Sequence, residues 1–191
     1  GSGTITPADP RADSADAMNG NAIAYDVNKI LTLGGATAYD HANATNRAYT
    51  IDLTSGQPVV ARTGDMAFAR SFANSVVLPN GQVVVIGGQT YPAPFSDTTS
   101  VMTPELWDPN SGAFTALASM PVPRNYHSVA NLLPDGRAFS GGGGLCGTCA
   151  TNHSDGAIFT PPYLLNADGS VKPRPAITVA PASAVNGSTI S

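Results

Sequence analysis

An apolar run that ends in two consecutive glycines occurs three times in this chain of 191 residues. Before each glycine pair, two apolar segments flank a turn signal, which is Val27-Asn28, Pro79-Asn80-Gly81 or Pro134-Asp135-Gly136. Turn residues of this kind between short apolar runs predict β-hairpins. The spacings between successive glycine pairs are 53 and 55 residues, for the pairs Gly34-Gly35, Gly87-Gly88 and Gly142-Gly143. A local pattern repeated at nearly constant spacing predicts copies of one structural unit.

Further strands are expected after a variable loop in each unit. Third strands are predicted at 47–53, 104–109 and 157–164, and fourth strands at 58–62 and 113–117. Units of about 50 residues with four antiparallel strands are typical of a kelch-type β-propeller. We therefore predict an all-β fold of three four-stranded blades with little helix, at about 17–67, 68–120 and 121–172, with the double-glycine strands near the ring axis. The alternative is a β-sandwich in which the glycine pairs recur by accident.

Three blades make an incomplete ring, because propellers typically close with 4–8 blades. An open arc would expose edge strands and the apolar faces of blades. We therefore expect the sequence to be part of a longer polypeptide, or one piece of a nicked one. Residues 173–191 are rich in Ala, Pro and Ser, and they are predicted to form a linker and the first strand of a C-terminal Ig-like β-sandwich domain.

Composition excludes some classes of partner. The net charge is −4 and only 12% of the residues are charged, with no cluster of Lys or Arg. This argues against nucleic acid and against an anionic membrane surface as partners. No run of 18 apolar residues occurs in the sequence, so no membrane-spanning helix is expected.

The adjacent pair Tyr126-His127 is a candidate site. Arg70 of the second unit matches Arg124 of the third, 54 residues later, so Phe72-Ala73 matches Tyr126-His127. The blade scaffold therefore does not need a hydroxyl and an imidazole at this place. Neighbouring residues of a strand point to opposite faces, so both could bind one metal ion only where the backbone bends. One extra residue before the following Leu-Pro turn favours a β-bulge, although a buried tyrosine beside a hydrogen-bonded histidine is the alternative.

Cys146 and Cys149 form a Cys-x-x-Cys motif that has three interpretations: half of a zinc site, a redox motif or a local disulfide. A zinc site needs two more ligands and no second Cys-x-x-Cys occurs, while a thioredoxin-like motif belongs near a βαβ pattern. A short-loop disulfide of a secreted protein fits best. His153 lies in a predicted turn and is better suited to fixing a loop than to binding metal.

The stretch RNYHSVANLLPDGRAFSGGGGLCGTCATNHSDGAIFTPPYLLNADG, residues 124–169, resembles the last blades of the galactose oxidase-like copper radical oxidases. DAMNGNAIAYDVNKILTLGG and FARSFANSVVLPNGQVVVIGGQ resemble the two preceding blades. The similarity extends over about residues 15–191. It implies three blades of a seven-bladed propeller that is followed by an Ig-like domain.

Members of that family are secreted enzymes that oxidise primary alcohols or aldehydes with O₂ and produce H₂O₂. They use one copper ion (Cu²⁺) together with a radical on a tyrosine that is linked to a cysteine. The resemblance implies that Tyr126 is an axial metal ligand and the catalytic proton acceptor, and that His127 is a metal ligand. It also implies substrate-binding roles for Tyr39, Phe72 and Phe95, and a structural disulfide between Cys146 and Cys149.

Other parts of the family's site have no match in this chain. The linked tyrosine and cysteine, a stacking tryptophan and the last histidine ligand belong to segments outside it, so the chain should hold at most half of the copper shell and no radical cofactor. We therefore expect an oxidase that is incomplete without the rest of the propeller and the C-terminal domain. Asp40 and Asn19 stand where galactose oxidase has Gln and Cys, so the substrate could be a sugar, another alcohol or an aldehyde. The alternatives are a kelch-type protein- or carbohydrate-binding propeller without catalysis, and a metal-free sugar epimerase.

Overall fold

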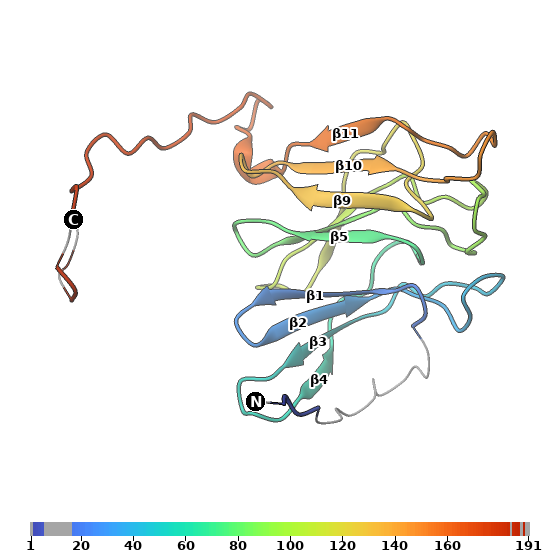
Figure 1. Ribbon diagram of the computed structural model, residues 1–191, viewed down its shortest axis with the longest axis horizontal. Helices are drawn as coiled ribbons and strands as arrows, with labels where there is room; N and C mark the ends of the chain where they lie inside the picture. Colours follow the sequence, from blue (N-terminus) through green and yellow to red (C-terminus); the bar gives the residue numbers. More distant parts are fainter. Residues whose placement is uncertain (1, 6–16, 184, 188, 190–191) are drawn as a thin grey trace. The chain divides into compact units, whose positions relative to one another are not determined.

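The computed structural model describes residues 2–5, 17–183, 185–187 and 189. Its contacts divide the chain into two units, Gly1–Pro161 and Pro162–Ser191. The first unit contains three antiparallel sheets (Figure 1). Within the described residues the only helix is a single 3₁₀ turn, η1 (Pro162–Leu164). The prediction of an all-β fold with little helix is confirmed.

The three sheets follow one another along the chain. The first has the order β1 (Asn21–Asp26), β2 (Lys29–Leu33), β3 (Ala48–Asp52) and β4 (Val59–Arg62). The second has the order β5 (Asn74–Val77), β6 (Val83–Ile86), β7 (Glu105–Trp107) and β8 (Phe114–Ala116). The third has the order β9 (Ser128–Leu132), β10 (Ala138–Gly142) and β11 (Gly156–Phe159). These sheets correspond to the three repeats.

The third sheet differs from the prediction of three four-stranded blades. Only three strands pair in it within the described residues. The strand expected at 157–164 ends at Phe159, and η1 begins at Pro162. Pro161 and Pro162 lack the N–H groups that a strand in a ladder donates, so the strand cannot continue through them.

The first strands of the sheets lie side by side. In Figure 1, β5 lies between β1 and β9, and it contacts both strands. The double-glycine strands β2, β6 and β10 are the second strands of their sheets. They therefore lie one strand further from the line where the sheets meet than the first strands do, and their place near a ring axis remains a prediction. The glycine pairs lie at the ends of these strands and not along their length.

The glycine pairs allow the next repeat to approach closely. A Cβ on Gly34 would lie 2.4 Å from the carbonyl oxygen of Arg70, and one on Gly87 would lie within 2 Å of the carbonyl oxygen of Arg124. Gly35 and Gly88 donate backbone hydrogen bonds of 2.9 Å to those same two carbonyls. The first two glycine pairs thus join their own sheets to the start of the next one, and a side chain at either pair would prevent this contact.

The apolar core lies between the first two sheets. It contains Leu31, Leu33, Ala48, Met66, Val83, Val85 and Trp107, all nearly inaccessible to solvent. The alternation along β2 directs Leu31 and Leu33 into this core. In contrast, β6 reads VVVI and all four of its residues are buried. A sheet that is covered on both faces requires such an uninterrupted apolar strand, and the middle sheet is covered by a neighbour on each side.

The second unit begins with η1 and continues through an isolated bridge between Leu165 and Val171. In the described part of residues 173–191 no strand forms. The predicted blade boundaries, the linker and the first strand of an Ig-like domain remain predictions. No helix in the described part of the chain has the length and apolarity to span a membrane.

Candidate active site

The candidate site lies where the first strands of the sheets begin. Tyr126 and His127 directly precede β9, and Phe72 lies two residues before β5. Tyr39 and Phe95 lie on the loops that follow β2 and β6. In an antiparallel hairpin the second strand ends where the first one begins, so these loops and these strand starts occupy the same end of the sheets. The fold thus brings the five residues predicted for the site to one place.

Tyr126 and His127 present their rings on the same side of the chain. The two rings stack, with centroids 3.8 Å apart and an interplanar angle of 27°. Neighbours in an extended strand would point to opposite sides. His127 has a φ of 65°, in the left-handed region that costs a non-glycine residue about 1–2 kcal/mol. Asn19 and Phe72 have the same left-handed φ, at 58° and 57°, so this bend belongs to the blade scaffold and the third repeat uses it to turn the imidazole toward Tyr126.

The extra residue of the third repeat lies before His127 and not after it, which corrects the sequence comparison. The ladder between β9 and β10 runs without interruption from Ser128↔Gly142 to Leu132↔Ala138, so there is no β-bulge. His127 therefore corresponds to Phe72, whose φ is also left-handed at 57°. The chain accommodates the additional residue in the bend between Arg124 and His127. A slip within the ladder would instead have moved every side chain of β9 to the opposite face.

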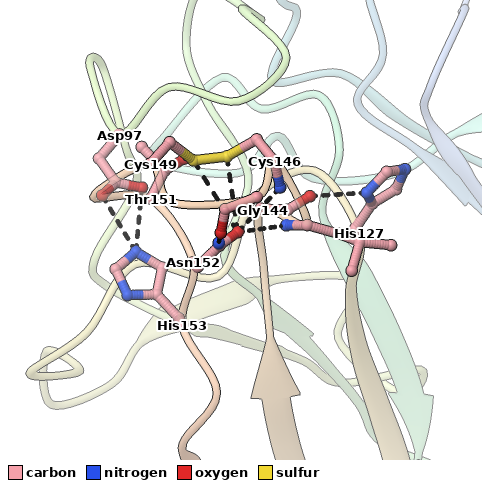
Figure 2. Close-up of a disulfide and its surroundings, with 10 residues drawn as sticks. Asp97, His127, Gly144, Cys146, Cys149, Thr151, Asn152 and His153 are labelled. Atoms are coloured by element: carbon pink, nitrogen blue, oxygen red, sulfur yellow. Dashed lines mark hydrogen bonds and ion pairs between the residues drawn. A yellow bond between two sulfur atoms is a disulfide. The ribbon is translucent and has the colours of Figure 1, made fainter.

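A backbone carbonyl orients the imidazole of His127. Its Nδ1 lies 2.7 Å from the carbonyl oxygen of Gly144 (Figure 2). A carbonyl only accepts, so Nδ1 carries the proton and Nε2 keeps its lone pair. In the described residues no hydrogen-bond partner is found for Nε2. A histidine whose other nitrogen donates to a backbone carbonyl is the usual arrangement of a metal ligand.

The loop that carries Gly144 is closed by a disulfide. Cys146 and Cys149 are bonded to each other, with Cα atoms 5.6 Å apart, which confirms the predicted disulfide (Figure 2). Asn152 holds the same loop from inside, because its Oδ1 accepts hydrogen bonds from the amides of Leu145 at 2.7 Å and Cys146 at 2.9 Å. The described residues contain no group of three or more His, Cys, Asp or Glu side chains that could hold a metal. The zinc interpretation of the motif is therefore not supported.

Aromatic rings surround Tyr126 edge-on. Phe72 lies 5.0 Å, Phe95 5.1 Å and Tyr39 6.3 Å from its ring centroid. Phe95 also lies 5.7 Å from His127. Beside them is a cavity of about 240 Å³, and Phe72, Tyr126 and His127 are among its lining residues. The three residues assigned to substrate binding thus form an apolar wall next to the Tyr126-His127 pair, while their role in binding remains a prediction.

Tyr39 interacts with Tyr126 through its ring and through its hydroxyl. Hydrogen bonding with the Tyr126 side chain raises the pKa of the Tyr39 phenol above its ordinary value, and the loss of hydration adds to this. A tyrosine phenol is protonated at neutral pH even without this shift, so the Tyr39 hydroxyl can donate a hydrogen bond. Asn19 fixes the Tyr39 backbone by donating to its carbonyl oxygen at 2.7 Å.

Three polar residues near the site were missed or only partly assigned from the sequence. His153 does fix a loop, as predicted, since its Nε2 lies 3.0 Å from Asp97. Asn152 and Asn125 received no role, although Asn152 holds the disulfide loop and Asn125 Nδ2 donates to Ser100 Oγ at 2.7 Å. The sequence could have pointed to Asn125 in one way, because it lies between Arg124 and Pro134, where the third repeat is one residue longer than the second.

Residues 20–152 match the family model described as glyoxal oxidase N-terminus. The match covers well over half of the chain. The chain belongs to the glyoxal oxidase N-terminus family. The resemblance to galactose oxidase-like enzymes that the sequence suggested is thereby confirmed.

Individual relatives agree with this family. Galactose oxidase from Gibberella zeae is 47% identical over 188 residues, which is 93% of this chain and 28% of the relative. The aldehyde oxidase GLOX1 from Arabidopsis thaliana is 31% identical over 171 residues, 80% of this chain and 28% of the relative. The chain therefore spans just over a quarter of the length of these curated relatives.

A solved structure shows the same fold. A fungal alcohol oxidase of the AA5 family, in complex with copper, superposes with a TM-score of 0.84 at 43% identity. The superposition covers 88% of this chain and 36% of the other one. This agreement confirms the prediction that the three sheets of this glyoxal oxidase family member are blades of a β-propeller.

Proposed function

We propose that this chain is a portion of a secreted copper radical oxidase, which oxidises a primary alcohol or an aldehyde with O₂ and releases H₂O₂. The observation that carries the proposal is the stacked pair Tyr126-His127, whose imidazole keeps an unpartnered Nε2 among the described residues. Its relatives include galactose oxidase, an aldehyde oxidase and an alcohol oxidase solved with copper. A propeller that only binds proteins or carbohydrates would not need this pair.

The residues of the chain fit a copper ion. Imidazole nitrogen and phenolate oxygen are donors that Cu(II) accepts. His127 would hold the ion through Nε2, since Nδ1 is already bonded to Gly144. Tyr126 would supply the phenolate. Copper, when bound, supplies the one-electron redox chemistry of the reaction.

The chain's own residues would handle the proton and the substrate. Tyr126 would accept the proton of the substrate hydroxyl at its phenolate oxygen, as a general base. The wall of Tyr39, Phe72 and Phe95 would bind the apolar part of the substrate and exclude water from the Tyr126 oxygen. The substrate is a small alcohol, sugar or aldehyde of a class that these relatives oxidise.

The remaining parts of the centre would come from outside this chain. Its two cysteines are joined to each other, so neither is available for a thioether link to a tyrosine. The radical cofactor and the other ligands would therefore belong to the rest of the propeller and to a C-terminal domain. Secretion is supported by the Cys146–Cys149 disulfide, because such bonds persist in oxidising compartments.

The test uses the full-length protein that contains this chain. We expect His127→Ala to abolish copper loading at stoichiometric metal, measured by metal analysis and by the Cu(II) electron paramagnetic resonance spectrum. We expect Tyr126→Phe to retain copper but to lower the rate of H₂O₂ production by roughly 10²–10⁴-fold, the usual contribution of a general base.

His41→Ala is the matched control. His41 is mostly exposed on the loop after β2, where it pairs with Asp40, and this substitution should leave copper loading unchanged. If full-length His127→Ala still bound one copper ion with an unchanged spectrum and activity, the assignment would be wrong and a binding propeller without catalysis would become the better reading.

A further inference from the structure

Phe95 lies at the candidate site, but its side chain is only partly buried there. Its side chain packs edge-on against both Tyr126 and His127, yet 44% of the residue remains exposed. It lies on the loop between β6 and β7 with a left-handed φ of 58°. A half-exposed ring in a strained backbone conformation is not fixed by burial alone. Other contacts must hold the loop in place.

The second repeat supplies one set of contacts from within. The fully buried Gln89 donates from Nε2 to the carbonyls of Ser96 at 3.0 Å and Thr98 at 2.8 Å. Its Oε1 accepts from the amide of Ala93 at 3.1 Å. These bonds give the loop its shape. They do not bring it toward the third repeat, where Tyr126 and His127 lie.

The third repeat supplies contacts from across the site. Asn125 Nδ2 donates to the carbonyl of Ser96 at 3.3 Å and to Ser100 Oγ at 2.7 Å, and a second contact comes from His153. The Nε2 atom of His153 lies 3.0 Å and 3.1 Å from the two carboxylate oxygens of Asp97, 56 residues away in sequence (Figure 2). His153 is itself anchored, because its amide donates to the carbonyl of Gly143 at 3.1 Å. The preceding residue, Asn152, closes the disulfide loop. One short segment of the third repeat therefore contacts both the loop that orients His127 and the loop that carries Phe95.

We propose that His153 is a positioning residue: through its hydrogen bond to Asp97 it keeps the Phe95 loop against Tyr126 and His127. The imidazole N–H at Nε2 donates and the carboxylate of Asp97 accepts. The pair is partly shielded, with 17% of the His153 side chain and 34% of the Asp97 side chain exposed. His153 touches neither Tyr126 nor His127 in the interactions found, so its effect passes through Asp97 and Phe95. Only the kinetic effect expected from this contact rests on the proposed function.

The kinetic test compares variants of the full-length, copper-loaded protein. His153→Phe keeps a ring but removes the donor, and Asp97→Ala removes the acceptor. Each should raise KM for an alcohol substrate by about five-fold, the value of one net hydrogen bond, and should leave kcat within about two-fold. Asp97→Asn keeps an acceptor oxygen and should restore KM to within about two-fold of the wild type. The double variant His153→Phe/Asp97→Ala should be no worse than either single one, because both remove the same bond.

Hydrogen–deuterium exchange tests the contact without any activity. The amides of Tyr91, Ala93 and Thr98 donate hydrogen bonds within the loop, so their exchange reports its order. In copper-free protein, His153→Phe and Asp97→Ala should speed exchange in residues 91–100, while Asp97→Asn should not. Copper affinity, measured by competition with a chelator, should stay unchanged because Gly144 and not His153 orients His127.

Two results would overturn the proposal. One is unchanged exchange of residues 91–100 in both disrupting variants. The other is a double variant whose effect on KM equals the product of the two single effects. If one of the two variants fails to fold, the variant of the other residue still tests the proposal. A wild-type protein that binds no copper and oxidises no alcohol would refute the proposed function, and the exchange measurement would still decide the role of His153.

Discussion

The Nδ1 atom of His127 lies 2.7 Å from the carbonyl oxygen of Gly144, 17 residues further along the chain. This bond sets the tautomer of the imidazole and points a lone pair away from the disulfide loop. The position of the Gly144 carbonyl depends on the close packing of Gly144 against Thr151 and Asn152. The structure therefore predicts that small changes in this loop affect the histidine at a distance.

Gly144→Ala should destabilise the protein and weaken copper binding together. Gly144 has a φ of 86°, and a Cβ there would lie 2.8 Å from Asn152 Oδ1 and closer still to the carbonyl of Thr151. Overpacking adds to the cost of a left-handed alanine, so we expect the free energy of unfolding to fall by about 2–4 kcal/mol. Urea unfolding and competition for copper in the full-length protein would measure both effects.

Gly147→Ala is the control for that loop. Gly147 also has a left-handed φ, 70°, but a Cβ there would meet nothing within 4 Å. We expect a loss of only about 1–2 kcal/mol and unchanged copper affinity. Equal losses of stability and affinity in the two alanine variants would show that the clash at Gly144 does not matter.

Arg70→Met should be more damaging than Arg124→Met. Arg70 pairs with Glu105, and both side chains are almost completely buried, whereas Arg124 pairs with Asp155, whose side chain is 52% exposed. Removing Arg70 leaves a buried carboxylate without its cation, which costs about 3–5 kcal/mol. After Arg124→Met, water can hydrate Asp155, and about 1–3 kcal/mol should be lost. Urea unfolding of the two variants checks the order, and the reverse order would contradict this account.

The stability of the protein should fall in acid partly through Asp155. The hydrogen bond from Arg124 holds the pKa of the Asp155 carboxyl below its ordinary value, which is about 4. A carboxylate whose pKa is lower in the folded state stabilises that state above the unfolded pKa, and this contribution is lost as the pH falls below about 4. Asp155→Asn should therefore lose less stability than the wild type as the pH falls from about 6 to about 2. Parallel pH profiles of Tm for the two proteins would rule out the contribution.

The cysteines should be fully oxidised in protein that is purified without a reducing agent. Thiol titration of the denatured, unreduced protein should find no free thiol, and both cysteines should react after reduction. The bridge closes a loop of four residues, so its loss should cost about 2 kcal/mol or less, at the low end for disulfides. Two reactive thiols before reduction would refute the bridge.

Local patterns in the sequence were enough to predict the three sheets, while Tyr39, Phe72 and Phe95 were assigned to the site through the family resemblance. Hairpin turns are short-range signals, and the glycine pairs mark where each of the first two sheets contacts the next repeat. Once the repeats are aligned, the loops that carry Tyr39 and Phe95 and the start of β9 must fall at one end of the sheets. The sequence comparison singled out Tyr126 and His127 by aligning them with Phe72 and Ala73, although the structure matches His127 with Phe72.

The geometry inside the site depended on contacts between distant segments. The sequence comparison placed the extra residue after His127, but pairing of β9 with β10 moves it into the bend before His127. The third sheet has three paired strands within the described residues and not the predicted four, and the strand expected at 157–164 ends before Pro161 and Pro162. The bonds His127–Gly144 and His153–Asp97 span 17 and 56 residues. Such bonds form only when whole loops pack together, and no periodicity along the chain encodes how two loops meet.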